Sequence, residues 1–179
     1  MKEEILDIVD VDENVIGQIA RKDSHKVASE KLGYIRVADL FLVNSVGKIW
    51  VPTRTADKVI APNGYDFSVG GHVESGDDYI QTLVREAKEE INIVIDEKDV
   101  EFISNVTYED NCYKQNLYLL RTNTTPTFNP SDFTNADWLT PSELIESIDS
   151  GHKAKSNLKN SVMLLQKYLD QANRLNMNF

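Results

Sequence analysis

The stretch Gly71-His-Val-Glu-Ser-Gly-Asp77-Asp-Tyr-Ile-Gln-Thr-Leu-Val-Arg85-Glu86-Ala-Lys-Glu89-Glu90-Ile-Asn-Ile93 combines a glycine start with an amphipathic second half. Apolar residues recur in that half with helical spacing and form one stripe, made of Ile80, Val84, Ala87 and Ile91. Glu86, Glu89 and Glu90 are three and four residues apart, so their carboxylates share another face of the predicted helix. The stretch therefore predicts a helix that begins near Gly76 and has an acidic face beside an apolar one.

The acidic face needs a positive partner, because like charges at this spacing repel one another and destabilise a helix. A divalent cation held by oxygen ligands meets that need. Arg85 is adjacent in the chain and can pair with one carboxylate, which fixes its orientation. For a Glu-x-x-Glu-Glu pattern taken alone, a solvated acidic helix face is the alternative.

The wider spacing resembles the Nudix box, whose pattern is Gly-x5-Glu-x7-Arg-Glu-apolar-x-Glu-Glu-x-Gly-apolar. The positions that match are Gly71, Arg85, Glu86, Ala87, Glu89, Glu90 and Ile93. Asp77 stands where the pattern has Glu, and Asn92 stands where it has Gly. Asp keeps the charge on a shorter arm, and Asn is the usual substitute for Gly at a left-handed helix C-cap. Neither change removes an expected metal ligand.

The resemblance implies a mixed α/β (α+β) fold, the Nudix three-layer α-β-α sandwich with a mixed sheet. It implies that Glu86, Glu89 and Glu90 bind Mg²⁺ or Mn²⁺ together with the carbonyl of Gly70, and that Arg85 orients them as part of the catalytic set. It further implies hydrolysis of a phosphoanhydride bond in a nucleoside di- or triphosphate, or in a nucleoside diphosphate linked to another group. We predict one domain over residues 1–179, with an N-terminal extension at 1–34 and the box at 71–93.

Composition and net charge indicate how many domains the chain forms and which partners it can bind. The chain has 179 residues and a net charge of −10, which fits one acidic domain and argues against binding to long nucleic acid or anionic membrane. Cys112 is the single cysteine, no apolar run approaches membrane-spanning length, and the first residues lack a signal-peptide core. We therefore predict a cytoplasmic protein that acts on a small phosphorylated partner, and a homodimer stays open.

Further elements follow from hydrophobic patterns and turn residues. We expect a hairpin of strands 5–9 and 15–19, and a short strand 66–69 leading into a tight Gly70-Gly71 turn. The other expected strands are 36–44, 48–53, 101–109, 113–121 and 136–139. Helices are expected after Thr140 and over 156–175, and residues 122–135 form a long loop of the kind that is often functional.

Several residues outside the box are candidates for binding substrate. Arg54 and Lys58 precede the glycine turn, so they contact phosphate or are ordinary surface charges. Gly71 and His72 lie in the turn itself. Asp39 is acidic in an apolar strand, which indicates either the wall of a wet cavity or a structural hydrogen bond.

The sequence leaves the identity of the general base open. It is one carboxylate inside or outside the box, and Glu109 and Asp110 at a strand end are candidates that could equally be an ordinary acidic turn.

The resemblance extends to the branch with type I isopentenyl diphosphate isomerase and its small bacterial relatives, through Leu6-Asp-Ile-Val9, Ser68-Val-Gly-Gly-His72 and Phe128-Asn-Pro-Ser-Asp132. The isomerase has a catalytic cysteine at the position of Gly70, whereas the hydrolase carboxylates are all present here. We therefore expect diphosphohydrolase chemistry on an isomerase-like scaffold. An isomerase of allylic diphosphates and a domain that senses a nucleotide without turnover stay as alternatives.

Overall fold

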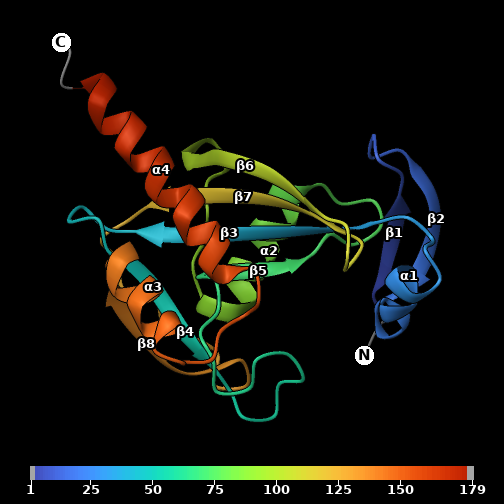
Figure 1. Cartoon of the computed structure of the whole chain (residues 1–179), viewed down its shortest axis with the longest axis horizontal. Helices are drawn as coiled ribbons and strands as arrows, with labels where there is room; N and C mark the ends of the chain where they lie inside the picture. The colour runs from blue at the N-terminus through green and yellow to red at the C-terminus, as the bar shows by residue number, and fades with distance from the viewer. Residues whose placement is uncertain (1–2, 177–179) are drawn as a thin grey trace.

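The computed structural model of the chain describes residues 3–176 and is shown in Figure 1. The strands are β1 (Ile5–Val9), β2 (Val15–Ala20), β3 (Ile35–Val43), β4 (Ile49–Arg54), β5 (Val69–His72), β6 (Val100–Tyr108), β7 (Tyr113–Arg121) and β8 (Phe133–Leu139). The helices are α1 (His25–Ser29), α2 (Tyr79–Ile91), α3 (Pro141–Asp149) and α4 (Leu158–Asn176), with 3-10 turns η1 (Arg21–Asp23) and η2 (Glu97–Asp99). None of these helices is both long and apolar enough to cross a membrane.

The main sheet is mixed and opens at its centre. Its strand order is β6-β7-β3-β4-β8, with β3 and β7 parallel and the other neighbours antiparallel. β3 and β4 pair only at Val43 and Ile49, and β5 then takes the place beside β3, so that Gly70 lies opposite Asp39. Both glycines of the expected turn therefore lie in a strand, at the point where the sheet divides.

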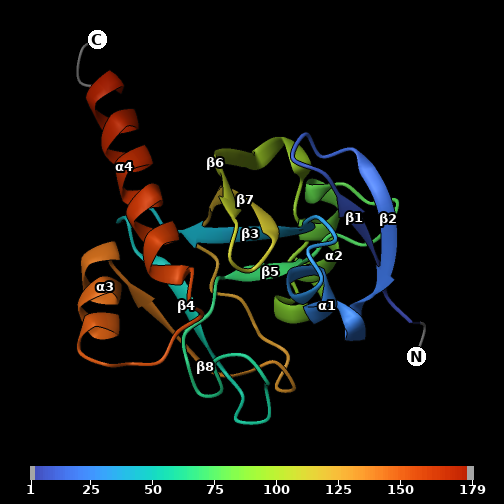
Figure 2. The ribbon, with the colours of Figure 1, turned by 45° about the vertical axis from the view of Figure 1, so that its right-hand side comes forward.

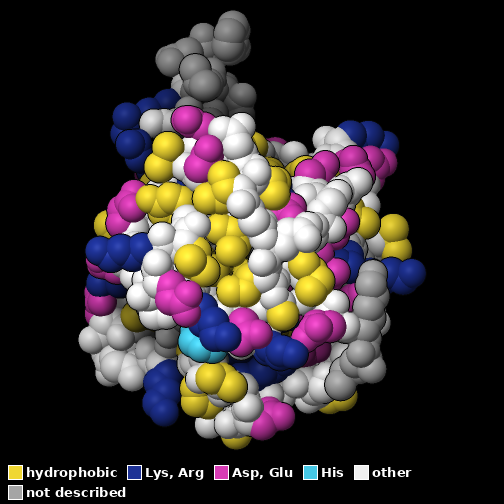
Figure 3. Space-filling model, turned by 90° about the vertical axis from the view of Figure 1, so that its right-hand side faces the viewer, with side chains coloured by type: hydrophobic (Ala, Val, Ile, Leu, Met, Phe, Trp, Pro, Cys, Tyr) yellow, Lys and Arg dark blue, Asp and Glu magenta, His cyan; other side chains and the backbone are white. Residues whose placement is uncertain are grey.

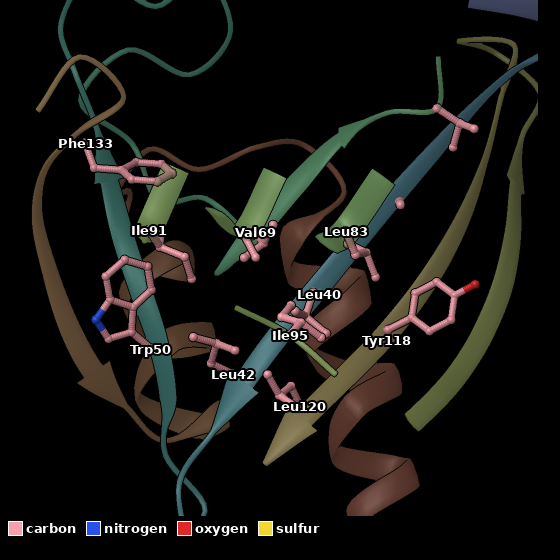
Figure 4. Packing of buried hydrophobic residues seen from close by; sticks show 13 residues of the cluster. Leu40, Leu42, Trp50, Val69, Leu83, Ile91, Ile95, Tyr118, Leu120 and Phe133 are labelled. Carbon is pink, nitrogen blue, oxygen red and sulfur yellow. The ribbon is translucent and has the colours of Figure 1, made fainter. Parts of the chain in front are cut away.

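Three layers result from the alternation of side chains along β3. Leu40 and Leu42 face α2 and pack with its Leu83 and Ile91, as Figure 4 shows. Phe41 and Val43 face the opposite way and pack in a second core with residues of α3 and α4. In Figure 1 α4 accordingly lies in front of the sheet and α2 behind it. The predicted α-β-α sandwich with a mixed sheet is confirmed.

The N-terminal hairpin forms a sheet of its own. β1 and β2 pair antiparallel, and backbone bridges join Leu6 to Glu74 and Val9 to Tyr34. Leu6 and Ile8 pack against Val27 of α1 in a small third core. Figure 2 shows the hairpin and α1 at one end of the main sheet, near β5 and α2. The predicted hairpin is confirmed, and it lies beside the box.

The chain around α2 differs from the prediction at its start. The N-cap is Asp78, not a residue near Ser75, because Asp78 and Gln81 form a reciprocal capping box. The helix therefore begins at Tyr79 rather than near Gly76. At its other end Asn92 has a left-handed backbone (φ 56°), as predicted from its replacement of Gly.

Three other boundaries also differ. The expected strand 66–69 is wrong: β5 spans Val69–His72, because its backbone pairs with β3 rather than turning at the glycines. β8 begins at Phe133, since pairing with β4 extends it into the expected loop. The polar segment after the hairpin contains η1 and α1. The predicted single domain of 1–179 includes residues 1–2 and 177–179, which lie outside the described part.

Candidate functional site

The acidic face of α2 opens on a cavity of about 360 Å³, here called the carboxylate cavity. Its acidic wall has the three predicted carboxylates, Glu86, Glu89 and Glu90, and β5 adds Gly70, Gly71 and His72. Basic residues from other parts of the chain complete it: Arg21, Arg54, Lys58 and Lys155. The fold therefore brings the predicted carboxylates, glycines and cations to one place, and the helix face is not an ordinary solvated one.

Glu86 lies between Arg85 and the backbone of β5. Arg85 donates a hydrogen bond to its carboxylate at 2.7 Å. A Cβ atom at Gly71 would come within 2.3 Å of Glu86 Oε1, so only glycine leaves room for this carboxylate. Burial raises the pKa of Glu86, although Arg85 opposes the shift. The glycine at 71 is thus required by the position of Glu86.

Glu90 lies deeper than Glu89 in the same cavity. The Gly70 N–H donates to Glu90 Oε2 at 3.3 Å. Burial, followed by repulsion from Glu86, raises the pKa of Glu90 to about 8. The Glu89 side chain is 63% exposed and points toward solvent at the mouth. Two of the three carboxylates are therefore held where their negative charge is unfavourable without a positive partner.

The donor chemistry of this wall fits a hard divalent cation, since carboxylate oxygens are the ligands that Mg²⁺ and Mn²⁺ favour. Gly70 was predicted to add its carbonyl, and its backbone lies against Glu90 through the N–H. Within residues 3–176, no three His, Cys, Asp or Glu side chains are already arranged around one point as ligands. The side chain of Glu86 is instead turned to Arg85. The residues fit the ion by type, and Arg85 holds one oxygen of the Glu86 carboxylate beside them.

Arg85 lies among four carboxylates. Besides Glu86, its guanidinium is 3.4 Å from Glu74, 3.8 Å from Asp77 and 3.9 Å from Glu89. Asp77, which replaces the Glu of the box, is therefore close enough to interact with Arg85. Arg85 therefore lies where it contacts several acidic side chains at once, which is the position that its predicted orienting role requires.

The basic residues of the cavity are themselves paired. Arg54 contacts Asp66, and Lys155 reaches the other oxygen of the same carboxylate at 2.8 Å. Lys58 pairs with Asp132 at 2.6 Å. The Arg54 side chain is only 13% exposed, so the alternative of an ordinary surface charge does not describe it. Asp66 thus fixes two cations that face the acidic wall.

Asp39 lines a neighbouring cavity of about 330 Å³, here called the Asp39 cavity. It also accepts a hydrogen bond from Gln115 at 2.6 Å, so both alternatives considered for it hold. Burial raises the pKa of Asp39 to about 6. His72 lines both cavities, and burial lowers its pKa to about 4, so its ring is neutral near pH 7.

Comparison with known proteins gives the family of the chain. The family described as NUDIX domain matches residues 33–160, which is most of the chain. The chain belongs to the Nudix family. It is 42% identical over 158 residues to an uncharacterised Nudix hydrolase of Nostoc, covering 87% of this chain and 91% of that protein.

Two further relatives define the branch. The crystal structure of DR0079 from Deinococcus radiodurans superposes with a TM-score of 0.79 at 37% identity, covering 89% of this chain and 98% of that one. An isopentenyl-diphosphate Delta-isomerase of Photorhabdus laumondii is 28% identical over 131 residues, covering 70% of this chain and 73% of that protein. The expected Nudix membership and the expected likeness to the isomerase are both confirmed.

The carboxylate cavity includes residues that the sequence did not single out as candidates. Arg21, Asn129, Asp132 and Lys155 line it, yet they lie outside the box and were not predicted as site residues. The sequence did point to the region of Asn129 and Asp132, because both lie in the long loop expected over residues 122–135, a kind of loop that is often functional. The Asn129 N–H donates to the Glu90 carbonyl at 2.7 Å, which fixes this loop to the end of α2. Glu109 and Asp110 do not line the cavity, and Glu109 accepts a hydrogen bond from Tyr34.

Proposed function

We propose that this Nudix chain hydrolyses a phosphoanhydride bond in a nucleoside di- or triphosphate, or in a nucleoside diphosphate linked to another group. The observation that supports this most is the juxtaposition of Glu86, Glu89 and Glu90 with Arg54, Lys58 and Lys155 across one cavity. Acidic side chains hold a divalent ion, and basic side chains hold phosphate oxygens. A cavity with both walls suits a metal-phosphate complex.

In the proposed mechanism each wall has a separate task. Glu86, Glu89 and Glu90 hold Mg²⁺ or Mn²⁺ with the Gly70 backbone, and Arg85 holds Glu86 and Glu89 in position. The ion, when bound, stabilises the charge that develops on phosphorus oxygens and lowers the pKa of water. Arg54 and Lys58 bind the phosphate groups, and a carboxylate of the cavity accepts the proton of the attacking water.

The remaining predicted residues position the substrate. Gly71 lets the phosphates approach the backbone of β5 closely, because it has no side chain. The neutral His72 ring lies where the two cavities meet, and Asp39 accepts a hydrogen bond from the group attached to the phosphates. The substrate would therefore extend from the carboxylate cavity toward the Asp39 cavity.

A hydrolysis screen tests the proposal. We expect the purified protein to release phosphate or nucleoside monophosphate from at least one of the nucleoside di- and triphosphates, sugar nucleotides and dinucleotides tested. Turnover should need added Mg²⁺ or Mn²⁺, because the carboxylates alone supply no positive charge. Activity that continues unchanged in excess chelator, or an absence of turnover across the whole panel with metal, would contradict the proposal.

Lys58→Ala is expected to raise KM about tenfold with little change in kcat, since a hydrogen bond to a charged group contributes about 1.5–3 kcal/mol and 1.4 kcal/mol is tenfold. Lys98→Ala is the matched control, because Lys98 is exposed and pairs with Asp96 outside the cavity. Arg54→Ala should raise KM and also lower Tm, because the buried Asp66 loses one of its two basic partners. If KM stays unchanged in both variants, these cations only balance Asp132 and Asp66.

We expect no isomerisation of isopentenyl diphosphate. The position of the isomerase cysteine is Gly70, and a Cβ atom there would come within 2.3 Å of Asp39 Oδ1. A cysteine thus does not fit beside Asp39 unless that carboxylate moves. Product analysis with the purified protein checks this, and clear formation of dimethylallyl diphosphate would show that the alternative activity is the right one. A sensor without turnover is disfavoured because all three box carboxylates are present.

A further inference from the structure

The N-terminal part of the chain encloses a second hollow beside the carboxylate cavity. This N-terminal chamber has a volume of about 690 Å³ and is lined on one side by Arg21, Lys22 and His25, together with Glu3 and Glu4, which pair with Lys22 and Arg21. These residues lie before residue 33, where the match to the Nudix family begins. The opposite side is formed by Arg54 and His72 of the Nudix fold.

The chamber adjoins the carboxylate cavity. Arg21, Arg54 and His72 line both hollows, together with Ile60 of the exposed loop after β4. Figure 3 shows the face on which the hairpin lies, where Lys and Arg side chains gather with Asp and Glu around a histidine in the lower half. A ligand too long for the carboxylate cavity could therefore extend into a space that is lined by cations (Arg21, Lys22, Arg54) and by two carboxylates (Glu3, Glu4).

Arg21 differs from the other cations of the carboxylate cavity in the solvent exposure of its ion pair. The side chains of Arg54, Lys155 and Lys58 are 13%, 22% and 29% exposed in their ion pairs, whereas that of Arg21 is 49% exposed. Its partner Glu4 is also exposed, at 40%. Exposed ion pairs contribute little to stability, so Arg21 can exchange Glu4 for a ligand at small cost.

The backbone holds Arg21 at this point independently of its side chain. The Arg21 N–H donates to the Glu4 carbonyl at 2.9 Å, which ties the start of η1 to the residue before β1. Arg21 is also near enough to contribute to the lowered pKa of His72. The backbone of Arg21 is thus held at the border of the two hollows, and its guanidinium, which pairs with the exposed Glu4, lines both.

We propose that Arg21 binds the terminal phosphate of a substrate with three or more phosphates in a row, with the N-terminal chamber receiving that end of the chain. The inference rests on the proposed function, since it assumes that the phosphates next to the cleaved bond lie in the carboxylate cavity. It assigns a specificity-determining residue to the hairpin extension, outside the Nudix fold. Nucleoside triphosphates, rather than diphosphates, are then the preferred class.

Calorimetric binding of inorganic tripolyphosphate and inorganic pyrophosphate to the full chain with Mg²⁺ tests this directly. Arg21→Ala should weaken tripolyphosphate binding about tenfold, as expected for one charge-assisted contact, and change pyrophosphate binding little. Lys26→Ala is the matched control, because Lys26 lies on α1, pairs with Asp23 and lines neither hollow. If tripolyphosphate is cleaved during the titration, its KM replaces the dissociation constant.

Glu4→Gln separates phosphate binding from a structural role of the Arg21–Glu4 pair. It releases Arg21 from its acidic partner, so tripolyphosphate should bind at least as tightly as to the parent. If Glu4→Gln weakens binding as much as Arg21→Ala, or if both probes respond equally to Arg21→Ala, the inference is wrong. It is also wrong if the parent does not bind tripolyphosphate.

The same measurements distinguish this inference from the proposed function. Arg21-dependent tripolyphosphate binding without turnover of any nucleotide would support the role of Arg21 in phosphate binding and contradict the proposed hydrolysis. Nucleotide hydrolysis whose KM for triphosphates does not depend on Arg21 would support the proposed hydrolysis and contradict the role of Arg21.

Discussion

Glu90→Gln is expected to lower turnover roughly a hundred- to a thousandfold, because metal stabilisation of transition-state charge contributes several kcal/mol and about 1.4 kcal/mol is tenfold. Glutamine keeps the size of the side chain and an oxygen that accepts from the Gly70 N–H, but it removes a negative charge from the expected ligand set. The matched control is Glu97→Gln, at an exposed position in η2. Its activity should equal that of the parent.

The same substitution should not destabilise the metal-free fold. The pKa of Glu90 is raised from 4.5 to about 8, so the folded chain holds a proton that the unfolded chain has lost between these values. Stability of the metal-free parent therefore falls as pH rises through this range, whereas the glutamine variant lacks this loss. The variant should melt higher than the parent in chelator, and the difference should grow from pH 5 to pH 8.

Added metal should reverse that order. Mg²⁺ or Mn²⁺ stabilises the state that binds it, so the Tm of the parent should rise more than that of Glu90→Gln. Melting curves with chelator and with metal, beside turnover of the same samples, measure both effects. A variant that melts lower than the parent in chelator, or keeps full activity with metal, would show that Glu90 has a structural role instead.

Gly71→Ala should be the second most damaging change to activity, with a loss of about a hundredfold if Glu86 can no longer take part in binding the ion. The new methyl carbon would lie 2.3 Å from Glu86 Oε1 and 2.6 Å from its Cδ, so the carboxylate must move away. The displaced group is the end of a flexible side chain, and we therefore expect Tm to fall little.

Gly17→Ala is the control for this change, because a Cβ atom there would meet nothing closer than 3.8 Å. Turnover and Tm of both variants should be compared with those of the parent. If Gly71→Ala retains activity, Glu86 need not occupy its present place. If it unfolds, the glycine is required by the fold rather than by the site.

Local patterns predicted the parts of this molecule that depend on neighbours in the chain. The spacing of Ile80, Val84, Ala87 and Ile91 predicted α2, and the same spacing placed the three carboxylates on one face. Asn92 predicted the left-handed helix end. The start of α2 was misplaced because Ser75 and Asp78 have the spacing of a helix-start signature, whereas Asp78 itself caps the helix by accepting from the Gln81 N–H.

Pairing between distant segments could not be predicted in the same way. The backbone of Gly70 and Gly71 joins β3 because β3 and β4 separate, and no property of the two glycines indicates that. Lys155 lies in a short connection before α4 without any motif, yet its ammonium reaches Asp66. The basic wall of the cavity therefore depends on tertiary contacts, whereas the acidic wall depends on a single helix.

The carboxylate of Asp66 has a consequence for how the protein acquires its site during folding. It joins Arg54, at the end of β4, to Lys155, at the entry of α4, and Lys58 is joined to Asp132 in a similar way. Contacts between residues as distant in sequence as Asp66 and Lys155 form slowly, because the entropy cost of closing a long loop comes before the favourable contact is made. The three carboxylates share one helix and need no such closure to lie on one face, whereas the positive wall requires contacts that extend from Arg54 to Lys155. Only a chain synthesised beyond Lys155 can complete the arrangement.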